Sequence, residues 1–149
     1  MTLTIGEVLT IIAITSSPLV AIQVQVWLEK YRVYARRQHE VFRMLMATRQ
    51  SQLNANHIDA LNRIDVDFYG ISILRLRWQY KTERDVIAAW REYHTHLHSD
   101  APDESDGRFA FNQRRSDLFV SLLRAIAVAC GYDFDKTLLE KMSYTPKNA

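Results

Sequence analysis

The sequence predicts an all-α protein in which an N-terminal transmembrane helix continues into a compact cytoplasmic bundle of about four helices. Three observations support this fold class. The 149 residues include only four Gly and three Pro, which is low for a turn-rich β protein. No charged residue occurs between Glu7 and Glu29. Beyond that stretch, apolar residues recur at three- and four-residue intervals, which is the period of an amphipathic helix.

The uncharged stretch defines the first of two predicted domains, a transmembrane helix over residues 1–28. Its 21 uncharged residues run from Val8 to Leu28. At about 1.5 Å per residue, a helix of about 20 residues crosses a hydrocarbon core of about 30 Å. Trp27 lies where an aromatic ring would meet lipid head groups. No Lys or Arg precedes the run, unlike in a signal peptide. The alternative is a helix buried in the core of a soluble oligomer.

Basic residues follow the apolar run directly. They predict a cytoplasmic location for everything that follows, because positive charge is retained on that side of a membrane. They are also placed to contact anionic lipid head groups. These residues are Lys30, Arg32, Arg36 and Arg37.

Polar side chains interrupt the predicted membrane helix, and Pro18 removes a backbone donor near its middle. Polar groups at membrane depth usually face other helices or water rather than lipid. We therefore predict a homo-oligomer in which some of these groups form helix contacts or line a lumen, although they form no single stripe. The candidates are Thr10, Ser16, Ser17, Gln23 and Gln25, with Thr15 a further polar residue in the run.

The second predicted domain covers residues 29–149 and is built from helices that each bury one apolar face. The first is expected to continue without a break to about Gln50, because no Pro or Gly intervenes. The expected faces are Val41, Phe42, Leu45 and Met46; then Ile58, Leu61, Ile64 and Phe68; then Val86, Trp90, Tyr93 and Leu97; and finally Leu118, Phe119, Leu122, Leu123, Ile126, Ala127 and Cys130.

Local signals predict the helix ends. Asn54 or Asn56 is expected to cap the second helix, which should stop near Gly70, and Thr82 with Asp85 is close to a capping box for the third. Residues 99–107 are expected to form an acidic surface loop, and Gly131 should end the fourth helix. The stretch 71–81 fits a short strand, a helix or a loop.

The amino-acid composition argues against an intrinsically disordered chain and excludes little else. The net charge of +2 is too small to imply nucleic-acid binding. The single cysteine, Cys130, cannot form an intrachain disulfide and is expected to pack in the core. No sequence pattern calls for a cofactor.

Several motifs resemble those of a family of small bacterial proteins of unknown function, which begin with a hydrophobic segment and continue as a helical domain. This resemblance covers nearly the whole chain and implies a bacterial protein. Together with the apolar run, it leads us to expect a location in the bacterial inner membrane with one membrane pass. The chain departs from the family pattern at 71–85, where extra residues are inserted. The motifs are TIGE (4–7), SPLVAIQVQVWLEK (17–30), VFRMLMATR (41–49), HIDALNRIDVDFYG (57–70), AAWREYHTHL (88–97), RSDLFVSLL (115–123) and GYDFDK (131–136).

In plan, the chain also resembles the small membrane pore protein that accompanies some type VI CRISPR systems. That resemblance is one of architecture: an N-terminal membrane helix, a cytoplasmic helical domain and ring assembly. It implies a role in anti-phage defence through membrane permeabilisation.

One candidate catalytic pair is Arg91 with His96 or His98. An Arg and a following His with four to six residues between them form the pattern of the helical HEPN ribonucleases, which need an imidazole for proton transfer and a guanidinium for phosphate. The pattern arises readily by chance in a chain rich in both residues.

A second candidate is the histidine cluster. His94 and His98 share a helix face at a spacing that metals use, but no third ligand is fixed by spacing. Four acidic residues follow: Asp100, Asp103, Glu104 and Asp106. We interpret the segment as a solvated helix end and predict no metal site.

The inserted segment joins cations to aromatic rings, a composition that suits single-stranded nucleic acid, a membrane surface or a protein partner. We take it as a candidate partner-binding site. Its residues are Arg75, Arg77, Trp78 and Tyr80, followed by Lys81.

Two D-x-D pairs, Asp65 with Asp67 and Asp133 with Asp135, are candidate paired carboxylates, although Asp near helix ends more often caps or meets a helix dipole. No Gly-rich phosphate loop is present.

We therefore expect a binding and assembly protein, not an enzyme. Its membrane helices would pack into a ring, and a phage or host protein would trigger it. The alternatives are a membrane-tethered ribonuclease using Arg91 and His96, and a monomeric anchored adaptor.

Overall fold

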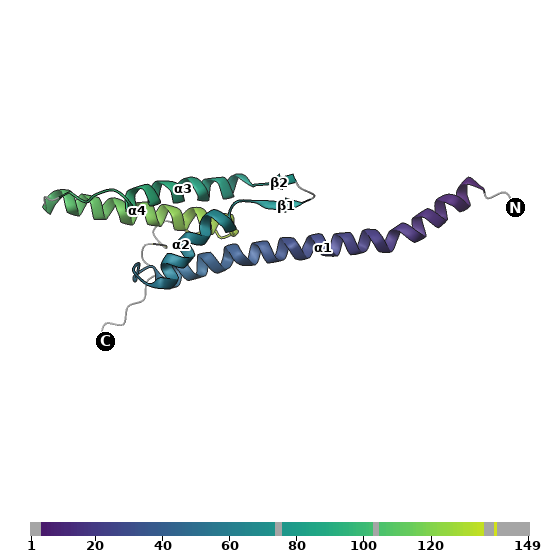
Figure 1. Cartoon of the computed structure of the whole chain (residues 1–149), viewed down its shortest axis with the longest axis horizontal. Helices are drawn as coiled ribbons and strands as arrows, with labels where there is room; N and C mark the ends of the chain where they lie inside the picture. The colour runs from purple at the N-terminus through teal and green to yellow at the C-terminus, as the bar shows by residue number, and fades with distance from the viewer. Residues whose placement is uncertain (1–3, 74–75, 103–104, 136–138, 140–149) are drawn as a thin grey trace. The chain divides into compact units, whose positions relative to one another are not determined.

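A computed structural model shows a mostly helical chain, as the sequence predicts (Figure 1). The residues that it describes form four helices and one small β-hairpin, which the all-α prediction did not include. The structure describes residues 4–73, 76–102, 105–135 and 139. The chain divides into two compact units, Met1–Tyr34 and Ala35–Ala149. The elements are α1 (Ile5–Thr48), α2 (Ala55–Asp67), β1 (Ile71–Ile73), β2 (Leu76–Trp78), α3 (Lys81–Leu97) and α4 (Ser105–Ala129).

Helix α1 confirms that the hydrophobic segment continues without a break into the helical domain (Figure 1). It runs through Pro18 and ends at Thr48, where the hydroxyl donates to the Met44 carbonyl oxygen across 2.7 Å. Asn54 then caps α2, because its side-chain oxygen accepts from the backbone N–H of Asn56 at 2.9 Å.

The segment between α2 and α3 is an antiparallel hairpin in which Ile71 pairs with Trp78. Gly70 leads into it with φ of 94°. A Cβ at this position would lie 2.6 Å from the Trp78 carbonyl oxygen. Both the positive φ and the close approach therefore require glycine. Three-residue strands are too short to show the alternation that identifies a strand in a sequence.

The N-cap of helix α3 is Tyr80, two residues before the predicted Thr82. The carboxylate of Glu83, not Thr82 or Asp85, accepts the backbone N–H of Tyr80 at 2.9 Å. The predicted capping residues were therefore wrong. Helix α4 also begins early, at Ser105, inside the segment that we expected to be an acidic loop through residue 107.

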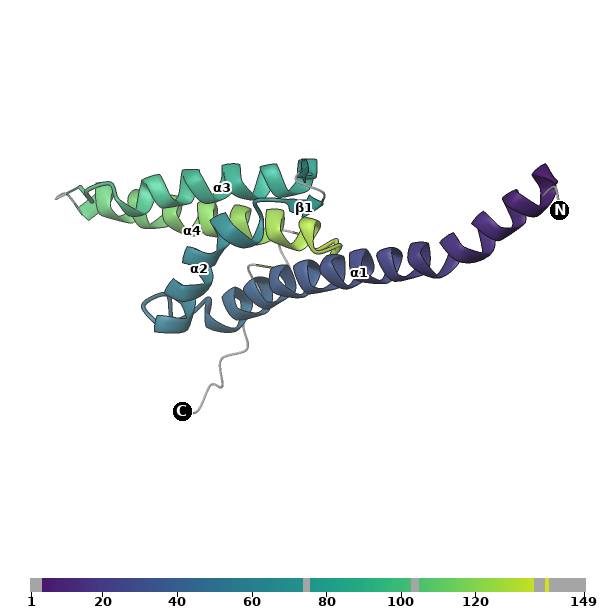
Figure 2. The same ribbon diagram turned by 45° about the vertical axis from the view of Figure 1, so that its right-hand side comes forward.

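Helices α3 and α4 lie side by side and antiparallel (Figures 1 and 2). Gly131, with φ of 81°, ends α4 as expected. The N–H of Tyr132 reaches back to the Ala127 carbonyl oxygen at 2.8 Å, which closes a Schellman motif.

The core of the second unit contains most of the predicted apolar faces. Ile58 and Leu97 are corrections, because both are exposed although their spacing suggested burial. Leu97 is the last residue of α3, and Ile58 points about 120° away from Ile64 around α2. Cys130 is half-buried against the core. The largest fully buried side chains include Leu45, Phe68, Ile64, Tyr93, Leu122 and Ile126.

Candidate functional site

The N-terminal part of α1 is the most unusual surface in the described chain. An 18-residue window in this helix has mean hydropathy 1.9 and none of it is buried. By length and composition α1 is therefore able to cross a membrane. An apolar side chain left in water forgoes about 1.5–3 kcal/mol of burial. The exposed large apolar residues of this segment are Ile5, Leu9, Ile11, Ile14, Leu19, Val20, Ile22, Val24, Val26, Trp27 and Leu28.

The hydroxyl groups in this segment are largely satisfied within the helix. Thr10 donates to the Gly6 carbonyl oxygen at 2.8 Å, and Thr15 donates to that of Ile11 at 2.7 Å. Ser16 reaches the Ala13 carbonyl oxygen at 3.4 Å. These three side chains do not need a second helix to complete their hydrogen bonds.

Gln23 and Gln25 differ from the hydroxyl residues. Both side chains are exposed, and neither makes a hydrogen bond within the described residues. Ser17 is in the same situation. An unpaired amide in hydrocarbon costs several kcal/mol, about 4–8 on alkane-transfer scales. At 3.6 residues per turn, Gln23 and Gln25 point in directions about 160° apart while lying only about 3 Å apart along the axis.

Aromatic and basic residues follow on the same helix. Trp27 and Tyr31 are exposed and lie one turn apart. Lys30, Arg32, Arg36 and Arg37 are exposed too, and no carboxylate of the described chain pairs with any of them. Aromatic rings beside cations form the pattern of a lipid–water interface.

The hairpin carries a second exposed surface. Leu76, Trp78 and Tyr80 are exposed, and the Arg77 guanidinium carbon lies 4.0 Å from the ring centre of Tyr69. The side chain of Gln79 donates to the Phe68 carbonyl oxygen at 3.0 Å, which ties the hairpin to the end of α2. Arg75, the fourth residue of the predicted partner-binding set, lies outside the described residues.

The candidate ribonuclease pair is separated on α3. Five positions apart, Arg91 and His96 point about 140° away from each other. The ring of His96 packs on Phe111 with 4.2 Å between centroids, and its Nε2 donates to the Phe111 carbonyl oxygen at 3.1 Å. In this structure His96 joins α3 to α4, and no contact within the described residues links it to Arg91.

The histidine cluster has no complete ligand set. The rings of His94 and His98 lie 4.2 Å apart, and His98 Nδ1 donates to the His94 carbonyl oxygen at 2.9 Å. No group of three His, Cys, Asp or Glu among the described residues is placed to hold a metal ion. Asp103 and Glu104 lie outside them.

The two carboxylates of the first D-x-D pair, Asp65 and Asp67, bind different partners. Asp65 accepts from the indole N–H of Trp90 at 2.9 Å, whereas Asp67 is buried and pairs with Arg63 at 3.2 Å. The two carboxylates therefore stabilise packing on different sides of α2 and do not act as a pair. Asp133 is exposed, and the backbone carbonyl of Asp135 accepts the N–H of Leu139 at 3.2 Å.

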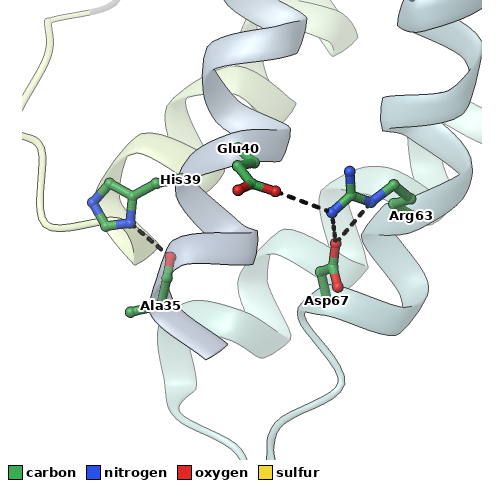
Figure 3. A network of polar contacts seen from close by, with 5 residues as sticks. All are labelled: Ala35, His39, Glu40, Arg63 and Asp67. Atoms are coloured by element: carbon green, nitrogen blue, oxygen red, sulfur yellow. Dashed lines mark hydrogen bonds and ion pairs between the residues drawn. The ribbon is translucent and has the colours of Figure 1, made fainter. Parts of the chain in front are cut away.

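A buried polar cluster joins α1, α2 and α3. Gln38 donates from Nε2 to Glu83 Oε1 at 3.1 Å and to the Asp67 carbonyl oxygen at 3.3 Å. All three residues are at most 5% exposed. Figure 3 shows the adjoining ion pairs, in which Arg63 bridges Asp67 and, at 3.7 Å, Glu40. It also shows His39 Nδ1 donating to the Ala35 carbonyl oxygen at 2.8 Å.

His57 is fully buried between α1 and α4. Its ring packs on Phe119, with 5.3 Å between centroids. The Thr48 hydroxyl donates to Met44, so it accepts from His57 Nδ1 at 2.9 Å. Nε2 is then an acceptor that has no hydrogen-bond partner in the described part of the chain. Burial lowers the pKa of His57, because a charged imidazole would lose its hydration there.

Comparison with protein families gives a match over nearly the whole chain. A family of unknown function (DUF6680) matches residues 2–149. The chain belongs to the DUF6680 family. No curated protein and no solved structure matches it.

The expected resemblance to a family of unknown function is thus confirmed for this DUF6680 member over almost its whole length. The sequence did not predict one feature of this family member, its buried polar cluster. The Gln38–Asp67–Glu83 cluster was missed because its members are polar and lie far apart in the chain. Only Asp67 had been singled out, as half of a D-x-D pair.

Proposed function

We propose that this protein is anchored in the bacterial inner membrane by α1, with residues 29–149 in the cytoplasm. There it assembles into a ring that permeabilises the membrane. The observation that carries the proposal is the pair of exposed amides, Gln23 and Gln25, on opposite sides of a helix long enough to span. One neighbouring helix covers only one of them.

Ring assembly resolves this difficulty. In a closed ring every helix has two neighbours, one on each side. Copies inserted in the same direction place Gln23 of one helix and Gln25 of the next at nearly the same depth, about 3 Å apart along the axis. An amide both donates and accepts, so the two glutamines are complementary. Interhelical hydrogen bonds of this kind are worth about 0.6–2 kcal/mol each.

The basic and aromatic residues after the span support the orientation. Lys30, Arg32, Arg36 and Arg37 would lie at the cytoplasmic head groups, where each cation contributes about 1 kcal/mol next to anionic lipid. Trp27 and Tyr31 would anchor the same boundary.

The proposed biological role is anti-phage defence, and the resemblance in plan to the CRISPR-associated pore protein supports it. A phage or host protein would trigger opening. The exposed hairpin around Trp78 and Tyr80 is the surface that we assign to that trigger. Replacing both by Ala should abolish protection against phage in plaque assays while membrane insertion and oligomer size stay unchanged.

Dye leakage tests the assembly. Full-length protein reconstituted in liposomes should release an enclosed dye, and Gln23→Leu with Gln25→Leu should abolish release. The matched control is Thr10→Val with Thr15→Val, which removes two polar groups that are already bonded within the helix. Equal leakage from both double variants would refute the role of the glutamines.

A monomeric anchored adaptor is the second candidate, because the same hairpin also suits a single protein partner. It predicts a monomer in mild detergent and no leakage from liposomes.

A further inference from the structure

We propose that a cavity between the end of α1 and the middle of α4 binds a small phosphorylated molecule through Arg49 and Arg115. This inference is independent of the ring and of the membrane helix, because every residue involved belongs to the second unit. The cavity has a volume of about 460 Å³ and is lined by Arg49, Gln50, Gln52, Leu53, Asn112, Arg115 and Ser116.

A second cavity of about 240 Å³ shares Arg49, Gln50, Gln52 and Ser116 with the first, so the two adjoin. It adds an apolar floor, formed by Phe119, Val120, Leu123 and Leu139. A polar mouth beside an apolar floor is the usual composition of a small-molecule site, and the volume of the first cavity is in the usual range of about 300–1,000 Å³.

The charge of the cavity points to an anion. Its described lining has two guanidinium groups and no carboxylate. Three arginines are half-buried in the described chain: Arg49, Arg63 and Arg115. Arg63 is paired with the carboxylates of Asp67 and Glu40.

The other two half-buried arginines lack such compensation. Arg49 Nη1 contacts the Met46 sulfur at 3.7 Å, and Arg115 Nη2 donates to Gln52 Oε1 at 3.1 Å. No carboxylate among the described residues lies within ion-pair distance of either guanidinium. Neutral partners leave both charges uncompensated where solvation is reduced, which is unfavourable until an anion binds.

Phosphate suits this arrangement better than a single carboxylate does. Guanidinium groups bind phosphate oxygens with two parallel hydrogen bonds, and two arginines match a group that carries up to two negative charges. Gln52, Asn112 and Ser116 offer neutral hydrogen bonds, and the floor at Phe119 suits an aromatic or aliphatic body. The ligand is therefore a phosphomonoester on an apolar or aromatic group, either a nucleotide or a lipid with a phosphate head group.

Calorimetric titration of full-length protein in phosphatidylcholine nanodiscs tests the site. The titrants are adenosine 5′-monophosphate, dihexanoyl phosphatidic acid and inorganic phosphate. At least one of the first two should bind tenfold or more tightly than inorganic phosphate, and which one does so identifies the source. If neither binds more tightly than inorganic phosphate, the proposal is wrong.

Charge variants test the residues. Arg49→Gln and Arg115→Gln should each weaken binding about tenfold or more, the effect of losing one charge-assisted hydrogen bond. Arg114→Gln is the control, because Arg114 is exposed and already paired with Glu92 at 2.6 Å. It should change affinity less than twofold. An equal loss in Arg114→Gln would show a nonspecific charge effect and overturn the site. If the Arg115→Gln variant has a lower melting temperature because it has lost the hydrogen bond to Gln52, its binding data are set aside. The affinity of the Arg49→Gln variant then decides whether the site is correct.

Discussion

Gln38 in α1 donates its side-chain amide to Glu83 in α3 across 3.1 Å, although 45 positions separate them in the chain. The same carboxyl group accepts the N–H of Tyr80 at the start of α3. The amide also bonds the Asp67 carbonyl at the end of α2. One buried side chain thus connects three helices, and through it the end of the exposed helix α1 is fixed to the helical domain.

Loss of this amide should be costly. Gln38→Ala removes one donor from the buried Glu83 carboxyl group, which still accepts the Tyr80 N–H, and one donor from the Asp67 carbonyl. We expect a loss of about 1–3 kcal/mol in the free energy of unfolding. Denaturant unfolding of full-length protein in mild detergent, followed by circular dichroism, measures it. Gln113→Ala is the control, because that exposed glutamine bonds Asp117 at only 3.5 Å. It should cost less than about 0.5 kcal/mol. Equal costs would contradict the structural role of Gln38.

Gly70 and Gly131 form a matched pair. Both have positive φ, at 94° and 81°. A Cβ at Gly70 would meet the Trp78 carbonyl oxygen at 2.6 Å, whereas one at Gly131 would meet no atom within 4 Å. Gly131→Ala should therefore cost about 1 kcal/mol, from backbone strain alone.

Gly70→Ala should cost at least about 2 kcal/mol more, because the hairpin must shift as well. Melting curves of the two variants side by side check this difference. If Gly70→Ala lowers the stability by no more than Gly131→Ala does, the described register of the hairpin is wrong.

His57 should make stability depend on pH. Burial lowers the pKa of His57 from its usual 6.5, so the unfolded chain binds this proton more readily than the folded chain. The contribution of His57 to the free energy of unfolding is therefore complete above pH 6.5. It is lost as the pH falls from 6.5 through the lowered pKa that His57 has in the folded state. His57→Leu should remove that part of the pH dependence. Unfolding free energies measured between pH 7.5 and pH 5 test the sign, and an unchanged slope in His57→Leu would contradict it.

Cys130 should be nearly inert. Burial raises the pKa of its thiol to about 12. At pH 8 the thiolate fraction is then lower by about a thousandfold than for a thiol of pKa 9. Maleimide labelling of the folded protein should be slow and should become fast on unfolding. Rapid labelling of the folded protein would place Cys130 at the surface.

Much of the fold follows from sequence pattern, because α1 to α4 bury apolar residues at helical period and carry local end signals at Asn54 and Gly131. Local pattern could not reveal contacts between distant polar residues. Gln38 and Glu83 look like surface residues until α1 and α3 are brought together. Arg49 and Arg115 lie on different helices, so nothing in the sequence shows that they share a cavity.

The sequence predicts which polar residues lie in the candidate membrane segment, but it does not predict their hydrogen bonds. The sequence identified Thr10, Ser16, Ser17, Gln23 and Gln25 as one group of polar residues. The structure separates them, because Thr10 and Ser16 bond their own helix while the two glutamines do not. That separation depends on side-chain geometry, which periodicity does not supply.

Disulfide crosslinking in membranes tests ring assembly most directly. In a Cys130→Ala background, Leu19→Cys and Ala21→Cys are combined and the membranes are oxidised, with each single variant alongside. These two positions lie one turn before Gln23 and Gln25 on the same two sides of the helix, so both glutamines are kept. The ring predicts a ladder of crosslinked species beyond the dimer from the double variant and none from either single variant. Monomers throughout, or dimers alone from a single variant, would contradict it.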